Sequence, residues 1–373
     1  MHRACGTAVI LVSATFGRGR INDVLHSNAR RTCRRDVPPR YRLRDCGWFP
    51  ASGMLSMRHA LLIFAPAVFA AAIFPAAATA HSVAGEIVHS AAGEELVRWQ
   101  NEIALLAPLL LSGLWYGVGF LRLATRVSSI HSPFRRNGAL FGLGWITLVA
   151  SLLSPLHELG EVSFTAHMAE HELLMLVAAP LMALSRPISV FLWACPAYMR
   201  RALVQGCNSR WVSHPWRIIS DPVVTTGVQI GALWLWHMPS LFDRALESEW
   251  WHAIQHLSFL GSSLLFWWSM TRGSHHSNRR AIAALCLFIT SLASGALGAL
   301  MAVSSSPWYA GYAAMDLHGL LPGGLTAAED QQLAGLIMWI PGGLVHFIAA
   351  LVFAYGALKQ GKVRDRSALA SHA

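Results

Sequence analysis

The sequence has little charge. Asp, Glu, Lys and Arg make up 13% of its 373 residues, whereas 54% are hydrophobic. An average water-soluble domain carries roughly a quarter charged residues. Several apolar runs of about 20 residues are also present, which is the length that a helix needs to cross the hydrocarbon core of a bilayer. The composition therefore excludes an ordinary soluble domain and predicts a polytopic membrane protein.

The formal net charge of +10 is concentrated in one part of the chain. Residues 1–59 contain 11 basic and 3 acidic residues, whereas the remainder contains 18 basic and 16 acidic residues. The excess charge therefore belongs to the extreme N-terminus and not to the hydrophobic domain. We expect no nucleic-acid partner.

Several chemical motifs are also missing. No nucleophile beside a base, nucleotide-binding loop or carboxylate pair occurs at the predicted membrane depth, which argues against an enzyme. None of the six cysteines forms a CxxC copper clamp or a CxxCH haem-attachment motif, and none falls on the predicted outer face. A copper site on that face would have to be built from histidine.

The N-terminus has two parts. Residues 1–53 are Arg-rich and aperiodic, and Met54 or Met57 offers an alternative start, so we interpret this extension as a misassigned start, with a disordered cytosolic tail as the alternative. Residues 54–80 have the basic start, apolar run and small-residue ending of a signal peptide cleaved before His81. Residues 81–373 form the predicted membrane domain.

Seven apolar segments follow the signal peptide, and each can form one membrane-spanning helix. The fold class expected is an all-α polytopic bundle of seven transmembrane helices. The segments run over Ile103–Leu121, Gly138–Leu156, Thr165–Leu184, Val223–Leu241, Trp251–Met270, Ala281–Val303 and Leu333–Leu358.

The connecting loops predict the orientation. Loops on one side contain 16 basic residues, whereas those on the other side contain only Arg98 and Arg244. Because basic loops remain in the cytoplasm, the mature N-terminus should lie outside and the C-terminus inside. The expected location is the bacterial plasma (inner) membrane.

Six histidines lie at similar depth near the outer ends of four consecutive predicted helices. Two pairs are spaced four residues apart, so each pair shares one helix face. Ionisable groups at membrane depth are usually functional, and imidazole is the commonest transition-metal ligand. We predict a metal site, the alternative being histidines that only make interfacial hydrogen bonds. The six are His157, His167, His171, His237, His252 and His256.

Five further residues could support this site. Met168 and Met238 supply thioether sulfur, which favours Cu(I), and Glu170 and Asp330 supply outer carboxylates. His346 follows a kink expected at Pro341, near the middle of the membrane. Copper is the expected metal, with haem b held by one histidine from each of the third and fifth helices as an alternative.

Other patterns concern architecture. Small residues that include Thr290 and Gly298 recur every four positions in the sixth segment and predict close helix packing. The inner loop Ile188–Val204 is expected to form an interfacial helix anchored by Trp193 and Arg200. The outer loop Ser304–Gln332 carries Trp308, Tyr309, Tyr312 and His318, and we expect an exposed partner-docking surface there.

Three stretches resemble a known family. They are HMAEH running into LLMLVAAPLMALSRP from His167, LWLWHMPSLFDRAL followed by WWHAIQHLSFLGSSLLFWW from Leu233, and DQQLAGLIMWIPGGLVHF from Asp330. Together they resemble the CtaG family of cytochrome c oxidase assembly factors, of the caa(3)-oxidase type, over most of residues 100–360.

The resemblance implies a non-enzymatic plasma-membrane protein that helps to mature haem-copper oxidase, by handling or delivering copper. The partners it implies are oxidase subunits, a periplasmic copper donor and the lipid bilayer. A haem b redox protein and a copper transporter remain the alternative functions.

Overall fold

The computed structural model describes residues 91–126, 132–272, 277–317 and 322–371. Every regular element in these ranges is helical, which confirms the all-α fold class. The predicted extension 1–53 and the predicted signal peptide 54–80 lie outside the described residues.

Four helical stretches are long and apolar enough to cross a membrane. The number rises to six if two bent pairs each form one span, α5 to α6 with α7 and α9 with α10. This indicates a multi-pass membrane protein, whereas seven spans and their orientation stay predictions. The four stretches lie in α2 (Ala91–Ala124), in α3 (Ser132–Leu153), in α13 (Ser277–Val303) and in the succession α15 (Ala327–Ile337), η3 (Met338–Gly342) and α16 (Gly343–Ser371).

The fifth predicted segment forms α12 (Glu249–Thr271). This helix has 23 residues, but it is not among the candidate spans because its histidine, glutamine and serine residues lower its hydropathy. It packs against α6 (Ala179–Leu184) and α10 (Pro222–Trp236). A helix rich in buried polar residues therefore lies among apolar ones.

The second predicted segment ends earlier than expected. Helix α3 stops at Leu153, and Ser154 caps a separate short helix, α4 (Pro155–Val162), by accepting a hydrogen bond from the Leu156 amide. His157, which was expected at the outer end of the second predicted helix, therefore lies on the separate helix α4. Ser163 then ends α4 and caps α5 (Phe164–Glu172).

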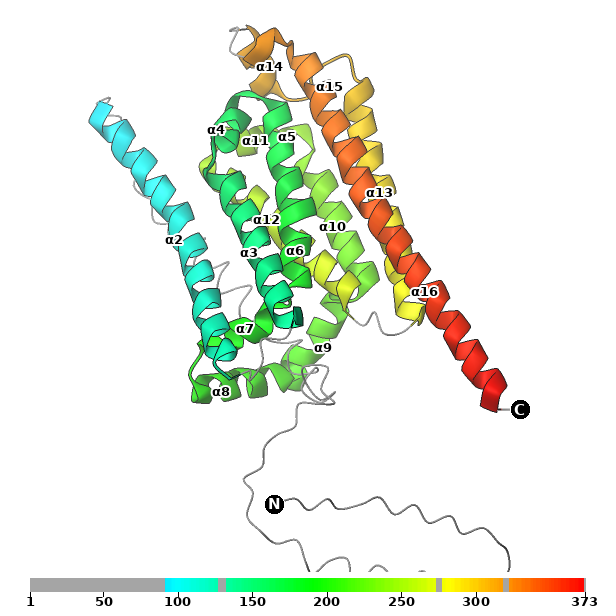
Figure 1. The fold of residues 1–373 in the computed structure, drawn as a ribbon. Helices are drawn as coiled ribbons and strands as arrows, with labels where there is room; N and C mark the ends of the chain where they lie inside the picture. Colours follow the sequence, from blue (N-terminus) through cyan, green and yellow to red (C-terminus); the bar gives the residue numbers. More distant parts are fainter. Residues whose placement is uncertain (1–90, 127–131, 273–276, 318–321, 372–373) are drawn as a thin grey trace, which may run out of the picture. The chain divides into compact units, whose positions relative to one another are not determined.

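Two helical stretches contain a π-helical turn. Helix α5 continues through η1 (Leu173–Ala178) into α6, and α15 continues through η3 into α16 (Figure 1). Pro341 lies inside η3 and cannot donate a backbone hydrogen bond. The structure accommodates the proline by this π turn, which lies at the position where a kink was expected and interrupts the regular α-helix there. Such turns are frequent at functional sites.

The stripe of small residues lets α13 approach its neighbour closely. A methyl group placed on Gly298 would lie 2.7 Å from the carbonyl oxygen of Gly335 and from the amide nitrogen of Trp339. Helix α13 accordingly lies beside α15 and α16 (Figure 1). The predicted close packing is confirmed.

The connections that were predicted to be outer fold over the ends of the helices. Helices α11 (Pro239–Glu247) and α14 (Ala310–Leu317) pack together, and their rings join a buried aromatic core. Tyr309 and Tyr312 are 2% and 3% exposed and contact Phe164 and Phe242. These two tyrosines therefore do not form the exposed docking surface that we expected.

The inner connection forms three helices: α7 (Pro187–Ala194), α8 (Ala197–Asn208) and α9 (Arg210–Ile219). The single interfacial helix expected over Ile188–Val204 is broken at Cys195 and Pro196. The guanidinium of Arg200 lies 4.3 Å from the ring centre of Trp193. The two expected anchors thus contact each other across the break.

Candidate metal centre

Helices α5 and α12 bring the two histidine pairs face to face. The rings of His167 and His252 are stacked with centroids 5.2 Å apart, and the rings of His171 and His256 lie 4.6 Å apart. Within each pair the two rings are 4.4 Å apart. The spacing of four residues therefore aims each pair at the other helix, as predicted.

Three histidines can coordinate one ion. Nitrogen atoms of His167, His252 and His256 all lie within 4.8 Å of one another. The Nε2 atoms of His252 and His256 are 3.0 Å apart. His167 is 1% exposed and His252 is partly buried, so the group lies at the edge of the packed interior.

A second group adjoins the first. It consists of His157 from α4, Glu170 from α5 and His256, again with ligand atoms within 4.8 Å of one another. Glu170 Oε1 lies 3.0 Å from Nδ1 of His157 and 3.6 Å from Nδ1 of His256. His256 is thus shared, because Nδ1 faces the carboxylate and Nε2 faces His252.

A histidine and a carboxylate are hydrogen-bonded to each other at the edge of the centre that faces α4. Glu170 is fully buried and accepts the hydrogen bond of His157. This hydrogen bond raises the pKa of His157 above its ordinary value, against the opposing effect of burial. A metal ion bound there would displace the proton from His157.

Several ring nitrogens have no protein partner. Nε2 of His167 and both ring nitrogens of His171 are buried without a hydrogen bond in the described part of the chain. The other nitrogen of His167 bonds the carbonyl of Gly160, which also accepts a hydrogen bond from Tyr312. Nδ1 of His167 is therefore the donor, and Nε2 presents its lone pair to the cluster.

His237 pairs with a sulfur atom. Its Nδ1 donates to the carbonyl oxygen of Leu233 at 2.6 Å, so in the neutral ring Nε2 has no proton. That Nε2 lies 3.4 Å from the sulfur of Met168. Both atoms are acceptors, so a soft cation could bind between them, whereas no hydrogen bond can form.

The donor set therefore fits a transition metal. Imidazole nitrogen and thioether sulfur suit Cu(I), and added carboxylate oxygen broadens the range to Cu(II) and Zn²⁺. Unpartnered buried nitrogens are rare in proteins, and a bound ion is one standard reason for them.

Comparison with known families now identifies the chain. The family model described as cytochrome c oxidase caa3 assembly factor (Caa3_CtaG) matches residues 114–360, which include all six histidines. The chain belongs to this family. The resemblance that the sequence motifs carried is thus confirmed.

The relatives add little on function. Uncharacterized proteins of Mycobacterium leprae, Mycobacterium bovis and Mycobacterium tuberculosis are 25%, 24% and 24% identical over 65% of this chain. The chain spans 36–37% of the length of these relatives. No solved structure matches.

The remaining predicted residues of this Caa3_CtaG protein lie apart from the two groups. Asp330 caps α5, where it accepts hydrogen bonds from Ser163 and from the amide of Phe164. Met238 is 51% exposed at the start of α11. His346 is stacked on Trp267, with ring centroids 5.5 Å apart, and its Nδ1 bonds the carbonyl of Gly342.

Sequence reasoning missed two buried polar groups of the Caa3_CtaG chain. Oε2 of Glu172 and the amide of Gln255 are buried without hydrogen-bond partners among the residues described. Glu172 lies against the π turn η3, since a methyl group on Gly342 would be 2.9 Å from Oε2. The signal available in the sequence was the position of Glu172 four residues after Met168, which puts the two side chains on one face of α5.

Proposed function

We propose that this Caa3_CtaG protein holds copper in the histidine centre and delivers it to a haem-copper oxidase during assembly. Membership of the assembly-factor family supports the oxidase as client. The buried cluster of imidazole and carboxylate groups supports a metal as the cargo. The role is non-enzymatic, since transfer of a bound ion requires only ligand exchange.

One observation carries the proposal, the position of His256 between two groups. Its two ring nitrogens face His252 on one side and Glu170 on the other. An ion held by the outer group therefore has one ligand in common with an ion held by the inner group. Such a shared ligand permits stepwise exchange of a cargo ion without its release into solvent.

The outer group is the entrance. The side chain of His157 is 23% exposed, whereas Glu170 is fully buried. Copper from a periplasmic donor would first meet His157 and Glu170, and His167, His252 and His256 would then hold it more deeply. His171, His237 and Met168 complete the set of nearby donors that we assign to the centre.

The membrane arrangement belongs to the same proposal. We infer seven spans in the bacterial plasma membrane, with α12 as the fifth, the mature N-terminus outside after signal cleavage and the C-terminus inside. This orientation places the histidine centre on the periplasmic side, where copper for the oxidase arrives. The oxidase subunits and the copper donor are then partners on that face.

Haem b fits the geometry less well. A porphyrin held between α5 and α12 would have to lie as a plane between one imidazole of each helix, with a ring nitrogen of each imidazole pointing at the iron. The rings of His171 and His256 are in edge-to-face contact at 4.6 Å, however, and those of His167 and His252 stack at 5.2 Å. Direct contact between the imidazoles favours a bare ion.

Copper transport is supported less than delivery. Polar side chains below the centre are hydrogen-bonded to one another: Ser263 donates to Gln229, and Thr225 pairs with Ser269 at 2.7 Å. Such pairs satisfy buried groups within the packed interior. They offer no series of open ligands leading inward.

Single alanine substitutions of the paired histidines test the proposal. His167→Ala, His171→Ala, His252→Ala and His256→Ala each remove a ligand or a close neighbour, so oxidase activity at limiting copper should fall at least about tenfold. The oxidase polypeptides should be present but deficient in copper, and added copper should partly restore the weaker variants. The measurement is oxidase activity together with its copper content in membranes.

His214→Ala is the matched control, because His214 is exposed on α9 and belongs to neither group. It should leave oxidase maturation unchanged. If all four variants accumulate normally and support full oxidase activity at limiting copper, the metal centre is not what the protein uses.

A further inference from the structure

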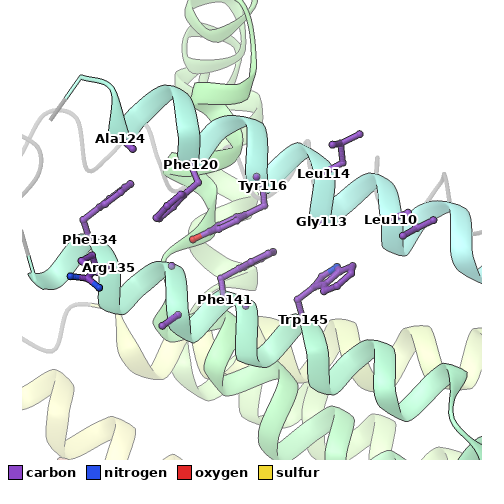
Figure 2. Close-up of a pocket in the computed structure, with 14 residues that line it drawn as sticks. Leu110, Gly113, Leu114, Tyr116, Phe120, Ala124, Phe134, Arg135, Phe141 and Trp145 are labelled. Atoms are coloured by element: carbon purple, nitrogen blue, oxygen red, sulfur yellow. The ribbon is translucent and has the colours of Figure 1, made fainter. Parts of the chain in front are cut away.

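A cavity of about 720 Å³ lies between α2 and α3, away from the histidine centre. Apolar side chains of both helices line it, among them Leu110, Leu114, Phe120 and Phe141 (Figure 2). Specific small-molecule sites have volumes of roughly 300–1,000 Å³. This cavity is therefore large enough for a defined occupant.

Aromatic side chains hold the two helices apart and so create the cavity. Trp145 of α3 lies against Gly113 of α2, where an added methyl group would be 2.8 Å from the indole. Phe120 of α2 lies against Gly138 of α3, where an added methyl group would be 2.6 Å from the phenyl ring. Helix α2 packs chiefly on α7, and it meets α3 mainly through aromatic side chains, including Tyr116 and Phe141, whose rings stack with centroids 3.6 Å apart.

Beside these aromatic contacts the wall of the cavity is open. Gly117 on α2 and Gly142 on α3 both line the cavity, and a methyl group added to either would meet no atom within 4 Å. Leu110 and Ala124 mark the ends of the lining on α2, a helical distance of about 21 Å at 1.5 Å per residue. One leaflet of the hydrocarbon core is about 15 Å deep. The cavity is thus long enough for an extended acyl chain.

Two polar groups interrupt the apolar lining. Arg135 is exposed and lies at the same end as Phe134 (Figure 2). The hydroxyl of Tyr116, which also lines the cavity, is buried without a hydrogen-bond partner in the described ranges. An occupant with a long apolar chain and an anionic head would satisfy the arginine, and its ester oxygen would lie near the tyrosine.

We propose that the α2–α3 cavity is a binding site for an anionic phospholipid. One acyl chain lies along the α2–α3 groove over Gly117 and Gly142, beside the stacked rings of Tyr116 and Phe141, and the phosphate pairs with Arg135. An apolar groove alone would accept any membrane lipid or a partner helix. The charge of Arg135 at one end selects a lipid with net negative charge, because guanidinium binds phosphate oxygens strongly. The site is independent of the copper proposal.

The test uses the full-length protein in lipid nanodiscs and in detergent. Phosphatidylglycerol and phosphatidylcholine with identical acyl chains are offered at equal concentration, and retained lipid is measured by native mass spectrometry. Wild-type protein should retain phosphatidylglycerol about tenfold better, the expected strength of one charge-assisted contact. Equal retention of the two lipids would overturn the proposal.

Variants test the contact with the lipid headgroup and the contact with the acyl chain separately. Arg135→Ala should abolish the preference for phosphatidylglycerol, whereas Arg136→Ala, an exposed neighbour outside the lining, should keep it. Gly117→Leu fills the space at the open wall and should reduce retention of both lipids at least fivefold. Gly231→Leu on α10 is the matched control, because its position is equally open and lies elsewhere. Loss of retention in both glycine variants alike would overturn the site.

Photolabelling of the wild-type protein tests the site without a substitution, so no change in folding can affect the result. A phosphatidylglycerol with a photoreactive group in its acyl chain should label peptides from Leu106–Ala124 and Pro133–Leu153, and free inorganic phosphate should not compete. Labelling spread over all helices would contradict the proposal. A photoreactive residue placed at position 117 that captures a protein in native membranes, and no lipid, would assign the cavity to a partner helix.

Discussion

At the scale of single residues, the centre combines buried nitrogen atoms that lack partners with hydrogen bonds that fix the remaining nitrogens. Leaving one buried polar atom unpaired costs about 1–3 kcal/mol. Nε2 of His167 and both nitrogens of His171 are in this state. The Gly160 carbonyl orients His167, and the Leu233 carbonyl orients His237. Fixed tautomers beside unpaired lone pairs are what a metal ligand needs.

Asp330 gives a prediction at this scale that separates capping from ligation. Its carboxylate accepts hydrogen bonds from Ser163 and from the amides of Phe164 and Thr165 at the start of α5. Asp330→Ala should therefore destabilise the fold by about 1–2 kcal/mol, and Asp330→Asn should cost less because one acceptor oxygen remains. Thermal unfolding in detergent measures both. A variant that keeps its stability but loses copper would show that Asp330 is a ligand.

Single residues were predicted well where spacing decides their placement. The pairs at 167 and 171 and at 252 and 256 face each other because each pair shares a helix face, and Glu170 lies beside them. Met238 and Asp330 were harder, since a neighbour in sequence or an outer position does not fix where a side chain points. Met238 became the exposed N-cap of α11, and Asp330 became a cap for α5.

At the scale of elements, breaks in the helices position the clustered histidines and Glu170. Ser154 ends the run of α3 and starts α4, which turns His157 toward Glu170. The π turn η1 begins at Leu173, directly after α5, and Trp267 of α12 donates to the carbonyl of Met175 within it. These breaks depend on local capping and on tertiary contacts. Hydrophobic runs alone extend through them, so the sequence predicted the segments and missed the breaks.

The close approach of α13 to α15 gives a prediction about an element. Gly298→Ala would place a methyl group 2.7 Å from backbone atoms of the facing helix, so it should destabilise the protein by about 1–3 kcal/mol. Gly231→Ala on α10 has open space and should be neutral or slightly stabilising. Thermal unfolding of both variants in nanodiscs measures the difference. Equal stability of the two variants would mean that α13 and α15 do not approach this closely.

At the scale of the whole molecule, hydropathy and charge predicted a multi-pass helical protein, and the family match agrees. The number of spans is harder to derive. Helix α12 carries His252 and His256 but is too polar to qualify as a span by composition, because these histidines, Gln255 and several serines lower its hydropathy. The same functional residues that indicate the site therefore weaken the hydropathy signal.

Orientation gives a prediction at this scale. A reporter that is active only outside the cytoplasm should be active when fused after Asp243 and inactive after Arg136, Arg210 or Arg280, because basic loops remain inside. Reporter activity in intact cells, normalised to the amount of fusion protein, measures this. Activity at Arg280 together with silence at Asp243 would place the histidine centre on the cytoplasmic side and contradict delivery from the periplasm.

The metal content and absorption spectrum of the purified full-length protein test the copper centre most directly. The protein should bind Cu(I) with nitrogen ligands detected by X-ray absorption, and the double variant His167→Ala, His256→Ala should lose most of this copper while the His214→Ala control retains it. Stoichiometric iron with a Soret band would contradict the account in favour of haem b. Copper binding that is unchanged in the double variant would equally contradict it.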